Sequence, residues 1–450
     1  MEYPAARKGK EFYIKFFQIA APVALQSLIT TGTSTMDSVM LGVFGEIYLS
    51  ATSFANEFFH FFKILCMGTG FGASVLIAQY YGHGEKHLIC QTITLMLRII
   101  ISLAAVFMLF SFVAPAEVMK IYTKDQLVIE AGARYLRILS CTFLIYGVMT
   151  TLTIALRSIS EARLPLIASF CSFWVNIFFN WVFIFGKLGA PKLEIAGAAV
   201  GTFIARSVEL SIILWYVLFK DQKISYKVRH FFLPANTILP VYIRYALPVL
   251  CVDTITAISG TCITMINGRI GTYYAAAAAI TALMYQLTDI FEMSISGASG
   301  VLVGQTIGSG DRDLAFSESR LSLRISAIIG GVCALICALG APTFISAFNI
   351  QAETQEISKQ LIWSLCTIIP FRFFTTTLGK GVLRGGGDTK FLLVTDELLR
   401  WIVAIPLGYA AAFFWRLPPY WVYLFLSCDR ILKILLFLTR FYSKKWIHML

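Results

Sequence analysis

Charged side chains are scarce in this sequence of 450 residues: Asp, Glu, Lys and Arg make up only 14% of it, whereas hydrophobic residues make up 58%. A soluble globular domain usually carries about 25% charged residues and about 45–50% apolar ones. A chain with so little charge has too few polar side chains to cover its core in water. The composition therefore argues against a disordered chain or a cytosolic enzyme domain and favours a protein that spans a lipid bilayer.

Motifs for nucleotide, metal or redox chemistry are also missing. The ten cysteines lie mostly inside apolar runs and form no C-x-x-C pair, so they are expected to act as small hydrophobic residues. The glycines around Lys380 and the triplet Gly385–Gly387 lack the order of a phosphate-binding loop. We therefore expect no cofactor and no ATP-binding subunit, which leaves an ion gradient as the energy source.

The formal net charge is +12. A basic balance in a soluble protein would suggest a nucleic-acid surface. Here the basic residues fall mainly in short gaps between apolar runs, where they would contact the anionic cytoplasmic face of a membrane. We expect the lipid bilayer as a partner and no nucleic acid.

Twelve apolar runs are long enough to cross a bilayer, which takes about 20 helical residues. They fall at 16–42, 49–81, 92–114, 129–156, 164–186, 195–219, 237–267, 274–307, 321–345, 357–382, 391–414 and 420–439. The gaps on the side of the termini hold 18 Lys and Arg residues, against 7 on the other side. This bias predicts a multi-pass protein of the cytoplasmic (inner) membrane with both termini in the cytoplasm.

The two halves of the sequence resemble each other. A shift of 226 residues places Pro22 on Pro248, Gly45 on Gly271 and Gly84 on Gly310. Because this shift contains six spans, an even number, the halves have the same orientation in the membrane. The expected fold is all-α, with twelve transmembrane helices in two pseudo-symmetric six-helix lobes around a central cleft. The N-lobe covers 1–219, a cytoplasmic linker 220–240 and the C-lobe 241–450.

Ionisable residues within spans are costly and are therefore functional candidates. Asp37 lies in the first span without a cation one turn away. A carboxyl group in a low-dielectric cavity can exchange a proton near neutral pH, so Asp37 is a candidate for coupling to H⁺ or Na⁺. The alternative is a carboxylate that is paired with a distant lysine or lies near the outer interface.

Other polar residues in the spans are weaker candidates. Asn176 and Asn180 lie four residues apart on one helix face, where their amides suit a cation or a carboxylic acid, or simply join helices. Together with Asp37 they form a possible Na⁺ site. Asp253 is a second candidate for coupling or cation recognition, unless it pairs with Arg244 near the cytoplasmic side.

Four further charged residues in the second and eighth spans are candidates for ion pairs that form and break at the cleft during transport. They are Glu57, Lys63, Asp289 and Glu292. Static pairing, particularly of Lys63 with Asp289, is the alternative.

Several segments resemble the MATE (multidrug and toxic compound extrusion) family, particularly its NorM-like branch. They are MDSVMLGVFG, LIAQYYGHGEKH, NIFFNWVFIFGKLGAPKLEIAGAAVGT, VLVGQTIGSGDRD and LRGGGDTK. The resemblance covers nearly the whole chain. It implies two lobes that operate by alternating access and export organic cations in exchange for H⁺ or Na⁺.

The resemblance also implies roles for individual residues. Asp37 matches the family's acidic residue in span 1, and Pro22 matches a proline proposed to bend that span. The polar cluster of the N-lobe matches Asn176, Asn180 and Thr202.

Two positions depart from the NorM-like pattern. Thr256 occupies the position at which that branch has an acidic residue in span 7. Phe373, beside Arg372, aligns near the acidic residue that the branch has in span 10. Part of a C-lobe cation site is therefore expected to be missing, which favours coupling through the N-lobe and leaves the ion open.

The predicted function is a secondary active antiporter that exports multidrug substrates, small amphipathic cations. One alternative is a lipid-linked oligosaccharide flippase of the same superfamily, which would need a strongly cationic cleft and often additional spans. The sequence gives no sign of either. A membrane-embedded enzyme is the other alternative, and it would need convergent His, Asp and Cys motifs that the sequence lacks.

Overall fold

A computed structural model describes residues 5–348 and 350–448, and the regular elements of these residues are helices. Within this part of the chain, nine helices have the length and apolar composition to cross a membrane. The remaining three predicted spans correspond to α9, to α12–α13 and to α14–α15. The all-α fold with twelve spans is confirmed.

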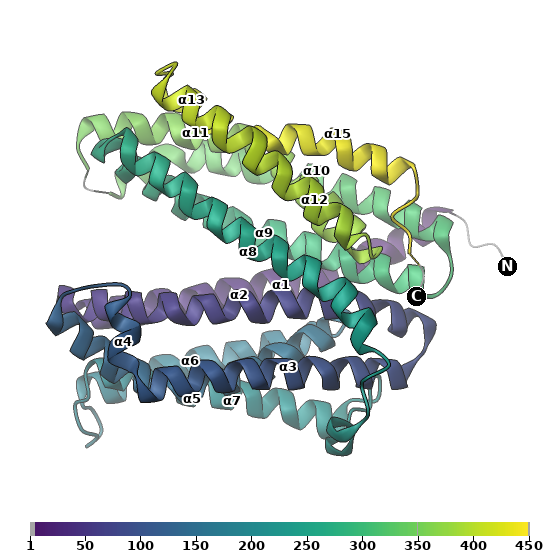
Figure 1. Cartoon of the computed structure of the whole chain (residues 1–450), viewed down its shortest axis with the longest axis horizontal. Coiled ribbons are helices and arrows are strands. Elements are labelled where there is room, and N and C mark those ends of the chain that lie inside the picture. Colours follow the sequence, from purple (N-terminus) through teal and green to yellow (C-terminus); the bar gives the residue numbers. More distant parts are fainter. Residues whose placement is uncertain (1–4, 349, 449–450) are drawn as a thin grey trace. The chain divides into compact units, whose positions relative to one another are not determined.

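The first half of the chain forms seven α-helices, of which α4 is a short connection. They are α1 (Ala5–Gly42), α2 (Glu46–His83), α3 (Lys86–Val113), α4 (Pro115–Lys120), α5 (Gln126–Ser158), α6 (Arg163–Phe185) and α7 (Ile195–Trp215). A π-helical turn, η1 (Tyr216–Lys220), and a 3₁₀ turn, η2 (Val228–Phe232), follow. In Figure 1, α2, α3, α5, α6 and α7 form one bundle.

The second half contains eight α-helices, and several are interrupted. They are α8 (Leu239–Ile270), α9 (Thr272–Gly308), α10 (Arg312–Ser346), α11 (Ala352–Thr376), α12 (Thr389–Leu399), α13 (Ile405–Phe413), α14 (Pro419–Phe425) and α15 (Asp429–Tyr442). The π-helical turns η3 (Thr377–Leu383) and η4 (Arg400–Ala404) extend α11 and join α12 to α13.

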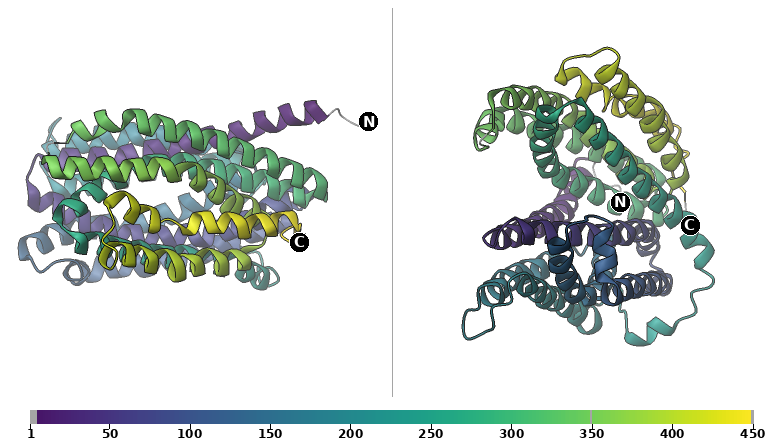
Figure 2. Two further views of the ribbon diagram at one scale, coloured as in Figure 1. Left: turned by 90° about the horizontal axis from the view of Figure 1, so that it is seen from above. Right: turned by 60° about the vertical axis from the view of Figure 1, so that its left-hand side comes forward.

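Backbone contacts divide the chain into two compact units. The N-terminal unit comprises Ala21–Tyr81 and Glu85–Leu247. The C-terminal unit comprises Pro248–Leu450 with Gly82–Gly84 and Met1–Ala20, as far as these residues are described. In the right-hand view of Figure 2, the helices of each unit are seen obliquely along their axes and run roughly parallel within that unit. The segment predicted as a linker, 220–240, belongs to the N-terminal unit, and the units differ from the predicted lobes also in parts of α1, α2 and α8.

The divisions in α1 and α8 fall next to the prolines that the sequence repeat relates. Pro22 lies just after the division in α1, and Pro248 begins the C-terminal share of α8. Both helices continue through their proline. Pro22 therefore does not end α1, although it removes one backbone donor from it.

The repeat is also present in the backbone. Gly84 and Gly310, which end equivalent helix pairs, have φ angles of 85° and 90°. Gly45 and Gly271, which separate α1 from α2 and α8 from α9, have φ angles of 104° and 155°. Residues other than glycine rarely adopt these positive φ angles, so glycine is needed at the same turn in both halves.

The segment predicted as a linker between the lobes is anchored to α3 of the N-terminal unit. Arg98 donates from Nη2 to the carbonyls of Phe231 at 2.6 Å and Leu233 at 3.0 Å. Gln91 donates to the carbonyl of Pro234 at 2.9 Å, and Thr94 to that of His230 at 2.8 Å. Because these bonds tie backbone carbonyls of the segment to side chains of α3, the segment has a defined path along that helix.

Small residues bring helices of the N-terminal unit into close contact. A Cβ atom on Gly72 would lie 2.3 Å from the Cα of Ala246, so α2 and the beginning of α8 pack backbone to backbone. Tyr242 donates its hydroxyl to the carbonyl of Thr69 at 3.2 Å at the same contact. The glycines of this span thus serve helix packing, as is usual between membrane helices.

Candidate transport sites

The N-terminal unit brings Asp37 together with the two asparagines predicted from their spacing. Asn180 on α6 donates from Nδ2 to Asp37 Oδ1 on α1 at 2.5 Å and to Asn176 Oδ1 at 3.3 Å. Both asparagines are fully buried, whereas Asp37 is half-buried. One amide thus holds a carboxylate against a buried face of α6.

The same cluster contains polar atoms that have no hydrogen-bond partner in the described chain. They are Asn180 Oδ1, Asn176 Nδ2 and Thr202 Oγ1, the last on α7. Buried polar groups are nearly always satisfied, so such atoms indicate a place for a ligand, an ion or water. Carboxylate, amide and hydroxyl oxygens are also the donors that a hard cation prefers. The residues present therefore fit a transported Na⁺ as well as a proton on Asp37.

A second polar network lies beside this cluster, and sequence reasoning missed it. Arg157 on α5 donates to Gln26 Oε1 at 2.6 Å, and Gln26 donates to Ser169 Oγ at 2.8 Å. Ser169 donates to Glu209 Oε1 at 2.5 Å, and Arg206 pairs with the other oxygen of Glu209 at 2.7 Å. The three-residue spacing of Arg206 and Glu209 within an apolar run was the available signal.

Two of the predicted cleft residues belong to this unit. The Nζ atom of Lys63 lies 5.2 Å from the ring centre of Phe59 and 5.7 Å from that of Tyr146. A desolvated ammonium group is stabilised by the faces of such rings. Glu57 is exposed. The predicted ion-pair roles of Lys63 and Glu57 stay predictions.

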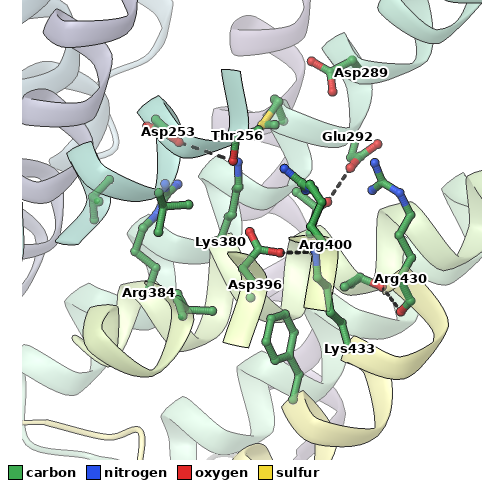
Figure 3. A pocket seen from close by; sticks show the side chains of 18 of the residues that line it. Asp253, Thr256, Asp289, Glu292, Lys380, Arg384, Asp396, Arg400, Arg430 and Lys433 are labelled. Carbon is green, nitrogen blue, oxygen red and sulfur yellow. Dashed lines mark hydrogen bonds and ion pairs between the residues drawn. The ribbon is translucent and has the colours of Figure 1, made fainter. Parts of the chain in front are cut away.

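The C-terminal unit contains a charged cavity of about 280 Å³. Figure 3 shows side chains from α8, α9, η3, α12, η4 and α15 extending into it. Its acidic lining residues are Asp253, Asp289, Glu292 and Asp396. Its basic lining residues are Lys380, Arg384, Arg400, Arg430 and Lys433.

The predicted acids of this unit are all paired with cations. Asp253 lies 3.7 Å from Lys380 Nζ, so its partner is Lys380 rather than the Arg244 considered from the sequence. Arg372, which is 1% exposed, pairs with Glu292 at 2.6 Å and with Asp289 at 3.3 Å. Thr376 also donates its hydroxyl to Glu292.

The acid expected to be missing at the position of Thr256 is supplied by another helix. Thr256 donates its hydroxyl to Glu397 Oε1 on α12 at 2.7 Å. Glu397 in turn lies 3.7 Å from Arg400. A carboxylate therefore reaches this part of the cavity wall, although span 7 does not carry it.

Further ion pairs of the C-terminal unit lie within α15 and join it to α12 and η4. Lys433, which is 2% exposed, lies 2.6 Å from Asp396 and 2.5 Å from Asp429. Arg400 lies 3.8 Å from Asp429. Sequence reasoning missed these residues, although the four-residue spacing of Asp429 and Lys433 within an apolar run could have found them.

Twelve spans built from two repeats, each repeat with buried charged and polar side chains that face one another, define a membrane transporter. The chain belongs to the MATE family: the family model MatE matches residues 22–182 and 248–410, more than half of the sequence. The two matches begin at Pro22 and Pro248, 226 residues apart, which confirms the internal repeat.

Relatives and solved structures agree with this assignment. The chain is 22% identical over 447 residues to a probable multidrug resistance protein NorM of Thermotoga maritima, covering 99% of this chain and 94% of that protein. It is 22% identical over 402 residues to the multidrug resistance protein NorM of Vibrio cholerae, covering 87% and 86%. The chain is a transporter and not an enzyme.

The fold likewise matches solved transporters. A multidrug resistance MATE transporter in an outward-facing conformation superposes with a TM-score of 0.86 at 17% identity, covering 96% of both chains. A Pyrococcus furiosus transporter, described as having a binding pocket of reverse polarity, superposes with a TM-score of 0.84 at 16% identity and the same coverage.

Proposed function

We propose that this chain is a secondary active antiporter of the cytoplasmic membrane that exports small amphipathic organic cations in exchange for H⁺ or Na⁺. Both termini would lie in the cytoplasm. The observation that carries the proposal is the cluster around Asp37, where a carboxylate in a membrane span faces two buried asparagines. The names of the NorM relatives support the class of substrate.

The site would couple two ligands by competition. When it is open to the cytoplasm, ionised Asp37 would attract a cationic substrate. When it is open to the other side, an entering H⁺ or Na⁺ would neutralise the carboxylate and release the substrate. Net transport requires that each ligand binds the two states with different affinity.

The unpaired atoms around Asp37 bear on the choice of ion. A proton needs only the carboxylate, whereas Na⁺ needs several oxygen ligands. Asn180 Oδ1 and Thr202 Oγ1 are two such oxygens without a hydrogen-bond partner in the described chain. They support Na⁺ as a candidate but do not exclude H⁺ as the coupling ion. The Na⁺ gradient and the pH gradient therefore have to be varied separately.

The test uses the purified protein in proteoliposomes with ethidium as a fluorescent cation. A pH gradient and a Na⁺ gradient are imposed in turn on the wild type, on Asp37→Asn and on Glu117→Gln, a control with an exposed acid. We expect one gradient to drive efflux, Asp37→Asn to abolish it and the control to retain it. Unchanged efflux in Asp37→Asn would remove this residue from the mechanism.

The basic residues of the C-terminal cavity favour a second candidate, a flippase of lipid-linked oligosaccharides. Such a substrate carries phosphate groups, which Lys and Arg side chains bind. The two candidates differ in the proteoliposome assay, because a flippase would not move ethidium under either gradient.

A further inference from the structure

We propose that the cavity of the C-terminal unit binds a carboxylate or phosphate group, so that the substrates of this protein include zwitterions or anions. The inference rests on the proposed function only for the direction in which the ligand moves. Five basic side chains and four acidic ones line the cavity. The formal charges of these lining side chains sum to +1, whereas the lining of a site for purely cationic substrates would carry a net negative charge.

Two of the four acidic side chains of the cavity are held in close ion pairs. Asp396 pairs with Lys433 at 2.6 Å, and Glu292 pairs with Arg372 at 2.6 Å while it also accepts from a threonine hydroxyl. A cationic ligand would have to displace these partners. Removing one partner of a buried pair leaves the other charge uncompensated, which strongly opposes such a displacement.

Several of the basic side chains lack a close carboxylate partner. Lys380 lies 3.7 Å from Asp253, and Arg400 lies 3.7 Å or more from both of its carboxylate partners. Arg430 donates to the hydroxyl of Tyr285 at 3.5 Å and, within the described chain, forms no ion pair with a carboxylate. These three cations can accept an anionic group without loss of a close ion pair.

The backbone presents these cations from three separate elements. Lys380 lies in the π-helical turn η3, Arg400 begins the π-helical turn η4, and Arg430 lies in the first turn of α15. In Figure 3 their side chains extend into the cavity, with Lys433 and Asp396 below them. Such π-helical turns are rare and occur often at functional sites, because the extra residue changes which side chains face the interior.

The chemistry of Arg430 and Arg400 indicates the class of ligand. A guanidinium group presents two parallel N–H donors, which match the two oxygens of a carboxylate or phosphate. Apolar side chains, among them Val249, Met293 and Phe437, complete the lining. The ligand is therefore an amphipathic molecule with one anionic group.

The experiment measures binding of dansyl-lysine to the full-length protein in detergent micelles, without any gradient. Its carboxylate is compared with the methyl ester of the same probe. We expect the ester to bind at least about tenfold more weakly to the wild type, because it cannot form charge-assisted hydrogen bonds with arginine. The same loss is expected for dansyl-lysine with Arg430→Gln, whereas Arg430→Lys should lose less.

The control is Arg320→Gln, which removes an exposed arginine of the same unit. It should bind both probes as the wild type does. Equal binding of acid and ester to the wild type would overturn the proposal even if Arg430→Gln failed to fold. Unchanged binding in a folded Arg430→Gln protein would also overturn it.

A competition arm identifies the source of the anionic group. Dihexanoyl phosphatidylglycerol is added to each protein with dansyl-lysine bound. If it displaces the probe from the wild type but does not displace the weakly bound probe from Arg430→Gln, the site binds lipid headgroups. Displacement by a soluble dicarboxylate alone would assign it to free solutes. Because no gradient is used, failure of Asp37-dependent transport would leave this result interpretable.

Discussion

The contact between Gly201 and Asn180 allows the Asp37 site to be perturbed without changing any polar residue. A Cβ atom on Gly201 of α7 would lie 2.0 Å from Asn180 Oδ1 and 3.1 Å from its backbone nitrogen. An ordinary contact between such atoms is about 3.5 Å, so the side-chain amide must move away from the new Cβ atom by more than about 1 Å. This movement breaks the 2.5 Å hydrogen bond to Asp37.

The magnitude follows from two contributions. Overpacking costs about 1–3 kcal/mol, and loss of a hydrogen bond to a charged group costs about 1.5–3 kcal/mol. We expect Gly201→Ala to lower the free energy of unfolding by about 2–4 kcal/mol, since relaxation recovers part of the sum. Ion-driven efflux of ethidium should fall at least about tenfold, because Asp37 loses the amide that positions it.

The assay is a double-mutant cycle of Gly201→Ala with Asn180→Ala. Each variant is measured by denaturant unfolding in micelles and by efflux from proteoliposomes. In the Asn180→Ala background, the alanine at Gly201 meets no amide, so the coupling should be about 1–3 kcal/mol. Gly260→Ala is the matched control, because nothing lies within 4 Å of a Cβ atom there. Equal costs of Gly201→Ala in both backgrounds would refute the reasoning.

Three further substitutions test other contacts. Arg98→Ala should destabilise the N-terminal unit by about 2–3 kcal/mol and expose the linker to proteases, because two linker carbonyls lose a charged donor; an unchanged digestion pattern would contradict the anchoring. Lys433→Gln should cost about 3–5 kcal/mol in the unfolding free energy because two aspartates lose their closest cation, whereas Lys444→Gln, at an exposed ion pair, should cost less than about 1 kcal/mol. Gly72→Ala should lower the melting temperature by several degrees, since it forces α2 away from the backbone of Ala246; a melting temperature equal to the wild type would show that the contact can relax.

The sequence predicted the spans and the Asp37 cluster for physical reasons that are local. A bilayer requires long apolar helices, so the runs are visible without knowledge of any contact. Asn176 and Asn180 share a face because they are four residues apart, and Asp37 is conspicuous because charges are rare in its span. These inferences need only the regular geometry of one helix.

The C-terminal cavity depends on information that is not local. Arg372 and Glu292 are eighty residues apart, and their pairing follows only from the packing of α11 against α9. Lys380 and Arg400 lie in π-helical turns, where the 3.6-residue period no longer tells which face a side chain occupies. Periodicity therefore could not place them at the cavity.

The division of α1 and α8 next to their prolines means that neither half of the gene encodes a complete compact body. A fragment that stopped at residue 219 would lack the beginning of α8, whose Tyr242, Tyr245 and Ala246 belong to the hydrophobic core of the N-terminal unit. The remaining fragment would lack the start of α1, where Phe16 and Ile19 are buried. During synthesis, the first unit can therefore complete its core only after the linker and the beginning of α8 have left the ribosome, although α8 belongs to the second half of the repeat.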